Sequence, residues 1–251
     1  MPGSFNKVFC LGLSRTGTTS LHEAFRGLGL RSVHFPIHLF TQSEVLGLPP
    51  FRPTVRLGPY AAWRRGKELK ASRAHHDAKS ILNGNDAFSD LPVPLYYREL
   101  DRLFPGSKFI LTTRDGDSWL ESMQWLFDDG AVLWKRGHVG DELHKRAYGT
   151  TVFDPEKLDA ARERHHREVA EYFDRRDGDI LTLRVDRGEL RYETLAGFLG
   201  METPLAGPCP RVNEARAVSG SDRLDRILKR FPPFSLFALL LTGLKKRGAG
   251  R

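Results

Sequence analysis

Cysteine is scarce in this sequence. Only Cys10 and Cys209 are present among 251 residues, and they lie far apart in the chain. Their separation matches neither a zinc motif nor a redox motif. The adjacent histidines at 165–166 do not make up for this, because neighbours on a helix point to different sides of it. We therefore expect no metal site, and a reducing, cytoplasmic setting.

Long apolar runs are also missing. The first apolar stretch covers only residues 8–13 and runs into a glycine turn, so we expect no signal peptide. Residues 234–244 are apolar but reach about half of the ~20 residues needed to span a bilayer. Basic residues follow them, which leaves two interpretations of 231–247. This segment is either a helix packed on the protein body or a peripheral contact with an anionic membrane, at the inner membrane face.

What the chain does contain is a phosphate-binding pattern near its start. Residues 7–21 read KVFCLGLSRTGTTSL, in which a buried strand, a turn from Gly12 to Gly17 and a helix follow one another. In such a unit the backbone N–H groups and the positive end of the helix converge on one point. Arg15 adds a fixed positive charge there, and residues 18–20 add three hydroxyls. A plain tight turn is the alternative interpretation.

The lysine of an ATPase loop is absent. The Walker pattern places lysine directly after its second glycine, where it reaches the terminal phosphates. Here Thr18 follows Gly17, and the cation, Arg15, comes two residues before that glycine. The loop therefore predicts anion binding without predicting ATP turnover.

Charge and periodicity together indicate one α/β domain. The 39 Lys and Arg residues outnumber the 31 Asp and Glu residues, for a net charge of +8, which favours an anionic partner. Apolar strands alternate with helical patterns, which predicts a parallel sheet flanked by helices, with ligands at the carboxyl ends of the strands. We expect a single domain over 1–230 and an apolar, then basic, tail over 231–251. The expected strands are 8–11, 31–36, 87–92, 108–113 and 179–185; the expected helices are 21–28, 61–82, 96–103, 119–127, 155–175 and 191–199; residues 37–60 and 128–151 are expected to be irregular.

A second anion site is predicted about 100 residues after the first. Arg114 ends the strand 108–113, and Ser122 lies eight residues on, in a helix for which Ser118 is a plausible N-cap. An arginine at a strand end and a hydroxyl on the next helix can point into one crevice, which suits a second phosphate. A salt bridge from Arg114 to one of the aspartates at 115 and 117 is equally open.

The two sites together resemble the nucleotide-binding framework of the sulfotransferase family, which uses 3′-phosphoadenosine 5′-phosphosulfate (PAPS). Residues 14–20 resemble its 5′-phosphosulfate loop, usually Pro-Lys-Ser-Gly-Thr-Thr and a variable residue. Residues 108–122 resemble its 3′-phosphate strand and helix, and 208–213 resemble its late loop over the nucleotide. The resemblance covers residues 5–215 and implies the P-loop-type α/β fold, PAPS as co-substrate and no metal. The cofactor-binding residues it implies are Ser14, Arg15, Thr16, Gly17, Thr18, Thr19, Ser20, Arg114 and Ser122.

Two positions depart from the family pattern. Arg15 replaces the usual lysine; its guanidinium can still neutralise charge on the leaving phosphate, but as a planar fork rather than a point charge. Ser20 stands where cytosolic members have a tryptophan that stacks on adenine. The residue that contacts the adenine is therefore not predicted.

Two carboxylates are candidates for the general base of an in-line sulfuryl transfer to a hydroxyl or amine. Asp90, in Ser-Asp-Leu-Pro, stands where cytosolic members resembling this chain have a catalytic histidine before Leu-Pro. Glu23 matches the position of the catalytic glutamate in heparan-type members. We favour Asp90, with Glu23 second; the plainer interpretations are a turn residue for Asp90 and a first-helix carboxylate for Glu23. Arg15 completes the expected catalytic set.

The acceptor is not predicted beyond a small molecule, a glycan or a lipid, and no nucleic acid partner is expected. Aromatic residues within 35–60 and 119–134 fit a hydrophobic alcohol or phenol, whereas the basic segment 61–82 fits an anionic sugar or lipid. Two other functions stay open at this point: a small-molecule or nucleoside kinase with a deviant P-loop, and a non-catalytic module that binds acidic lipid. The oligomeric state is not predicted.

Overall fold

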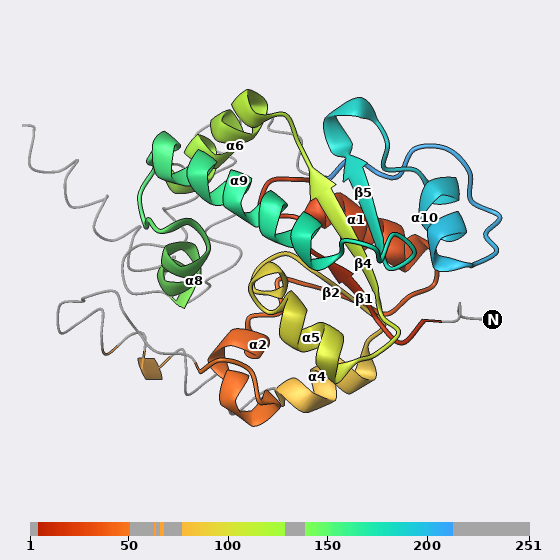
Figure 1. The fold of residues 1–251 in the computed structure, drawn as a ribbon, viewed down its shortest axis with the longest axis horizontal. Helices are drawn as coiled ribbons and strands as arrows, with labels where there is room; N and C mark the ends of the chain where they lie inside the picture. Colours follow the sequence, from red (N-terminus) through yellow and green to blue (C-terminus); the bar gives the residue numbers. More distant parts are fainter. Residues whose placement is uncertain (1–4, 51–62, 64–65, 68–76, 129–138, 213–251) are drawn as a thin grey trace, which may run out of the picture. The chain divides into compact units, whose positions relative to one another are not determined.

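The computed structural model describes residues 5–50, 63, 66–67, 77–128 and 139–212. Within these ranges the strands form one parallel sheet in the order β2-β3-β1-β4-β5 (Figure 1). The carboxyl ends of all its strands therefore share one edge, as predicted. The strands are β1 (Val8–Cys10), β2 (Ser32–His34), β3 (Ala87–Ser89), β4 (Lys108–Thr113) and β5 (Ile180–Arg184).

β1 is central because its side chains are apolar on both faces. Phe9 pairs in register with Phe88 of β3 and Phe109 of β4, and its ring centroid lies 5.6 Å and 5.7 Å from theirs. Its neighbours Val8 and Cys10 point to the opposite face, since side chains alternate along a strand. Burying one such side chain contributes about 1.5–3 kcal/mol.

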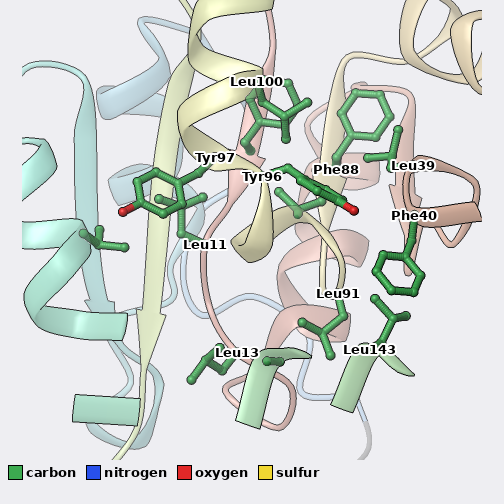
Figure 2. Close-up of a cluster of buried hydrophobic side chains, with 14 of the residues drawn as sticks. Leu11, Leu13, Leu39, Phe40, Phe88, Leu91, Tyr96, Tyr97, Leu100 and Leu143 are labelled. Atoms are coloured by element: carbon green, nitrogen blue, oxygen red, sulfur yellow. The ribbon is translucent and has the colours of Figure 1, made fainter. Parts of the chain in front are cut away.

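Helices cover both faces of the sheet. One face packs on α1 (Thr18–Gly27) and α10 (Tyr192–Leu199). The other face and the helices on it form a larger cluster, in which Figure 2 shows Leu13 from the loop, Leu91 from the segment after β3 and Leu143 from α8. The helices of this cluster are α2 (His38–Thr41), α4 (Ala78–Gly84), α5 (Tyr97–Leu103), α6 (Gly116–Asp128), α8 (Val139–Tyr148) and α9 (Pro155–Tyr172).

Two segments expected to be irregular contain helices. Residues 37–60 include α2 and the 3₁₀ turn Ser43–Leu46, and residues 128–151 include the ten residues of α8. Glycines near both ends of α8 make its apolar periodicity hard to recognise in the sequence. In the structure Leu143 and Tyr148 of this helix are buried in the larger cluster. Tertiary packing therefore stabilises a helix that its own sequence indicates weakly.

Helix boundaries differ from the prediction at two places. Most of the expected basic helix 61–82 lies outside the described residues. Within it, α4 begins at Ala78, after the N-cap residue Asp77, whose carboxylate accepts hydrogen bonds from the N–H groups of Lys79 and Ser80. The prediction of Ser118 as N-cap was wrong. α6 starts earlier, and Asp115 accepts the Ser118 N–H at 3.2 Å, because a carboxylate is the stronger acceptor at a helix start.

Residues 1–212 form one compact unit. The expected tail 231–251, and with it the contact through 231–247, lies outside the described residues, so the boundary at 230 stays a prediction. Among the helices of the described ranges, none has the length and apolarity needed to cross a bilayer.

Candidate active site

The loop after β1 turns where two glycines allow it. A Cβ on Gly12 would lie 1.8 Å from the Thr112 hydroxyl oxygen, so only glycine lets the chain leave β1 against β4. Gly17 precedes α1 with φ +84°, a left-handed conformation that favours glycine. The Thr16 hydroxyl is occupied within the loop, since it donates to the Leu13 carbonyl at 2.7 Å and lies 2.9 Å from the Thr112 hydroxyl.

The start of α1 leaves groups available for an anion. Its first backbone N–H groups have no acceptor within the helix, and Gly17 carries no side chain to cap them. Thr18 is 3 % exposed, and its hydroxyl makes no hydrogen bond within the part of the chain that the structure describes. Because a buried hydroxyl without a partner is costly, this pattern fits an oxygen-rich ligand such as a phosphate group.

Ser14 is held at three points. Its backbone N–H donates to the Tyr148 hydroxyl at 3.1 Å, and its carbonyl accepts from the Trp119 indole at 3.0 Å. Its own hydroxyl donates to Asp90 Oδ1 at 2.9 Å. Burial raises the pKa of Tyr148, which therefore stays a neutral phenol. The sequence analysis missed Tyr148 and the contact of Trp119, because both partners come from more than 100 residues away.

Arg15 brings a half-buried guanidinium to the loop. Its Nε donates to the Ser122 hydroxyl at 2.8 Å, and its guanidinium carbon lies 4.8 Å from the centroid of the Trp125 ring. Burial lowers the pKa of Arg15, the nearby Arg114 charge lowers it further, and Asp90 opposes both. No ion pair of Arg15 occurs among the described residues, so its charge is available for a bound anion.

Arg114 lies near Arg15 but has a different hydroxyl partner from the one expected. Its Nε donates to the Ser118 hydroxyl at 3.0 Å, whereas the Ser122 hydroxyl accepts a hydrogen bond from Arg15. The alternative of a salt bridge to an aspartate at 115 or 117 is not observed in the described ranges. Beside Arg114 opens a pocket of about 230 Å³ lined by Thr113, Arg114, Asp115, Gly116, Arg162, His166 and Arg184.

Asp90 lies against the loop, directly after β3. Its Oδ1 accepts from the Ser14 hydroxyl and, at 2.8 Å, from the Leu91 N–H, and its Oδ2 lies 3.5 Å from His34 Nε2. Its φ is +68°, and Arg15 and Phe35 at the same edge of the sheet also have positive φ. Non-glycine residues keep a positive φ only where surrounding contacts hold the backbone in that conformation, and such residues are frequent at functional sites.

Glu23 is placed differently. It forms an ion pair with Arg26 at 3.2 Å on α1, and one of its oxygens lies 3.8 Å from His22 Nε2. The structure gives Glu23 no contact with Ser14 or Arg15. Asp90 is thus the carboxylate that it brings to the loop, although a catalytic role for either residue stays a prediction.

The segment 208–212 contacts α1 through Val212. Ser20 Oγ accepts the backbone N–H of Val212 at 3.0 Å, and Cys209 N–H donates to the Leu190 carbonyl at 3.0 Å. The Thr19 hydroxyl lies 3.3 Å from His34 Nε2. Val212 therefore lies beside Ser20 at the start of α1, and the role of 208–213 over a nucleotide stays a prediction. No group of three or more potential metal ligands occurs among the described residues.

These observations define the class of protein: a parallel α/β protein with a glycine loop at the carboxyl end of its central strand and two arginines near one another at that edge. The chain belongs to the sulfotransferase family, since the family model described as "Sulfotransferase domain" matches residues 7–218. The family and the α/β fold expected from the sequence are confirmed.

Two further comparisons were found. A curated relative, "Ava biosynthesis cluster protein M" of Aspergillus versicolor, is 36% identical over 119 residues, which are 47% of this chain and 42% of that protein. The chain thus matches less than half the length of that relative. A solved structure, a sulfotransferase from Alicyclobacillus acidocaldarius, is similar with a TM-score of 0.45 and 14% identity, covering 94% of this chain and 95% of that one.

Proposed function

We propose that this protein transfers a sulfuryl group from PAPS to a hydroxyl or amine acceptor. The observation that carries the proposal is that a cation and a carboxylate both lie next to Ser14. Arg15, which forms no ion pair among the described residues, follows Ser14 in the loop, and the Asp90 carboxylate accepts a hydrogen bond from the Ser14 hydroxyl. A cation for a leaving phosphate beside a carboxylate for an acceptor proton is what in-line sulfuryl transfer requires.

The site residues fit the donor. The 5′-phosphosulfate would be held by the first N–H groups of α1, the Thr18 hydroxyl and the Arg15 guanidinium. The 3′-phosphate would be held by Arg114. When bound, PAPS supplies an activated sulfuryl group on a phosphate that is a good leaving group. An arginine can neutralise that phosphate through a bidentate contact, which lysine cannot make.

The chain's own part in the reaction is positioning, charge stabilisation and proton removal. Asp90 Oδ1 already accepts two hydrogen bonds, whereas Oδ2 lies 3.5 Å from His34 Nε2 and has a lone pair left to take up a proton from the acceptor. A positioned base contributes about 10²–10⁴-fold to the rate. Arg15 opposes the charge that grows on the phosphate, and one such preorganised donor contributes about 10²–10³-fold.

The rival functions are not favoured. A kinase loop needs lysine after Gly17, where this chain has the buried Thr18, and the family match favours transfer chemistry over a passive lipid-binding module. A small alcohol, a glycan and a lipid all stay open as acceptors. Both cysteines are free and buried, which fits the reducing, cytoplasmic setting that we infer.

Sulfur-labelled PAPS and pools of phenols, sterols, glycolipids and sugars test the proposal. We expect labelled product with one pool, and a raised melting temperature with PAPS or with its product 3′-phosphoadenosine 5′-phosphate (PAP), because a ligand that binds only the folded state stabilises it. If ATP with Mg²⁺ stabilises the protein while PAPS and PAP do not, the sulfotransferase proposal fails.

A further inference from the structure

An imidazole joins three elements beside the loop. His34 ends β2, and its Nδ1 lies 3.1 Å from the Ser89 hydroxyl at the end of β3. Its Nε2 lies 3.3 Å from the Thr19 hydroxyl on α1 and 3.5 Å from Asp90 Oδ2. One nitrogen therefore faces the sheet interior, and the other faces the groups to which we assign donor binding and proton removal.

The surroundings determine which nitrogen carries the proton. Ser89 is 0 % exposed, and His34 Nδ1 is the one side-chain partner of its hydroxyl within the described ranges. A buried hydroxyl that does not donate its hydrogen is energetically costly, so Ser89 donates and Nδ1 accepts. The hydrogen of the neutral imidazole then lies on Nε2, directed at Asp90 and Thr19. An ionised carboxylate only accepts, which suits this arrangement.

We propose that His34 is a positioning residue that holds the Asp90 carboxylate in place through Nε2–H and is itself oriented by Ser89. This inference rests on the proposed function, because it takes Asp90 as the base. Since Nε2 also lies beside Thr19, the same ring links the carboxylate to the helix whose first turn would bind the donor.

The backbone supports this role. Phe35, directly after His34, has φ +55°, and Asp90 has φ +68°. Such a conformation is unfavourable for a residue with a side chain, so surrounding contacts must maintain it. The Phe35 N–H donates to the Ser89 carbonyl at 2.9 Å, which ties the ends of β2 and β3 together at this point.

A second histidine provides a matched control. His22 on α1 has its ring centroid 5.6 Å from that of His34. Its Nδ1 is 2.8 Å from the Ser32 hydroxyl, and its Nε2 is 3.8 Å from Glu23. Burial lowers the pKa of His22, and the His34 charge lowers it further. It has the same chemistry and the same neighbourhood but no contact with Asp90.

Side-chain ¹⁵N NMR of the full chain tests the proton placement without any turnover. We expect His34, assigned by the loss of its signals in His34→Gln, to carry its hydrogen on Nε2 at neutral pH. Ser89→Ala removes the donor to Nδ1 and should give a mixture of the two tautomers, whereas His22→Gln should leave His34 in the same tautomer as in the wild type. An Nδ1–H tautomer in the wild type, or no response to Ser89→Ala, overturns the proposal.

Kinetics with labelled PAPS and the acceptor found in the pools test the role. We expect His34→Ala to lower kcat about 10–100-fold, as for other residues that orient a functional side chain, with unchanged PAPS KM and PAP affinity. His34→Gln, whose amide can donate toward Asp90, should recover most of kcat, and His22→Gln should match the wild type. A wild-type rate in His34→Ala overturns this inference alone; absence of transfer by the wild type overturns the proposed function, and the NMR result then still decides the proton placement.

Discussion

At the scale of residues, the loop depends on side chains that bind its backbone. The Ser14 N–H has the Tyr148 hydroxyl as its acceptor, and both groups are buried. Tyr148→Phe should therefore leave that N–H without a partner and lower the free energy of unfolding by about 1–3 kcal/mol. Urea denaturation measures the change.

Tyr192→Phe is the control for this prediction. The Tyr192 hydroxyl makes no hydrogen bond with any part of the chain that the structure describes, so its removal should change stability by less than about 0.5 kcal/mol. Equal effects of the two substitutions would show that Tyr148 contributes packing alone.

Substitutions of Arg114 and Asp90 should affect different quantities: ligand affinity for Arg114 and turnover for Asp90. Arg114→Ala should weaken PAP binding by about 1.5–3 kcal/mol, the range for hydrogen bonds to charged groups. It should leave the affinity for adenosine 5′-phosphosulfate, which has no 3′-phosphate, unchanged. Calorimetric titration of both ligands measures this. Equal weakening of the two would exclude Arg114 from the 3′-phosphate site.

Asp90→Asn should act on turnover instead. The amide keeps the size of the side chain but cannot take a proton, so kcat should fall about 10²–10⁴-fold. PAP affinity should stay at the wild-type level. Glu23→Gln is the matched comparison, and a larger loss there than at Asp90 would transfer the role of base to Glu23.

At the scale of elements, the junction of β1 with its loop requires close approach to β4. Gly12→Ala would put a methyl group 1.8 Å from the Thr112 hydroxyl oxygen and 3.0 Å from its carbonyl oxygen. We expect a loss of about 1–3 kcal/mol or more in thermal or urea unfolding, because backbone cannot move aside cheaply. Gly197→Ala in α10, where a methyl group meets open space, should instead be neutral or stabilising by up to about 1 kcal/mol. A stable Gly12→Ala protein would contradict this account of the junction.

A partly buried imidazole links α9 to the end of β1, and its contribution to stability depends on pH. His165 Nε2 donates to the Leu11 carbonyl at 2.7 Å, and burial lowers the pKa of His165 to about 4. The unfolded chain takes up this proton near pH 6.5, so between about pH 6.5 and 4 it binds more protons than the folded protein, and stability falls as pH falls.

The measurement is the free energy of unfolding at pH 7 and pH 5. We expect His165→Gln, which does not titrate, to lose roughly 1–2 kcal/mol less between these values than the wild type. Above pH 7 the two curves should run parallel. An identical fall in both proteins would show that other groups cause it.

At the scale of the whole molecule, the chain carries a net charge of +8, and the donor that we propose is highly anionic. Screening lengths shrink from about 10 Å at 0.1 M salt to about 3 Å at 1 M. PAP affinity should therefore fall steadily with added sodium chloride, whereas adenosine affinity should not. Titrations at several salt concentrations check this, and equal salt dependence for both ligands would contradict an electrostatic role of the surplus charge.

The sequence by itself determined the features that depend on neighbours along the chain. The glycine turn with Arg15, the strand 108–113 and the parallel α/β class follow from local spacing and alternation, whereas Asp90 was indicated by the family resemblance of Ser-Asp-Leu-Pro. These signals are short-range, because turn chemistry and strand alternation act within a few residues.

The tertiary structure alone decided which distant groups meet. Ser122 bonds Arg15 rather than Arg114, Tyr148 comes from a helix that its own residues indicate weakly, and His34 faces Asp90 because β2 and β3 are adjacent in the sheet. Each of these contacts joins side chains from different elements. Its existence depends on strand order and helix packing, which no local pattern encodes, and for that reason the partners of the loop could be found only in the fold.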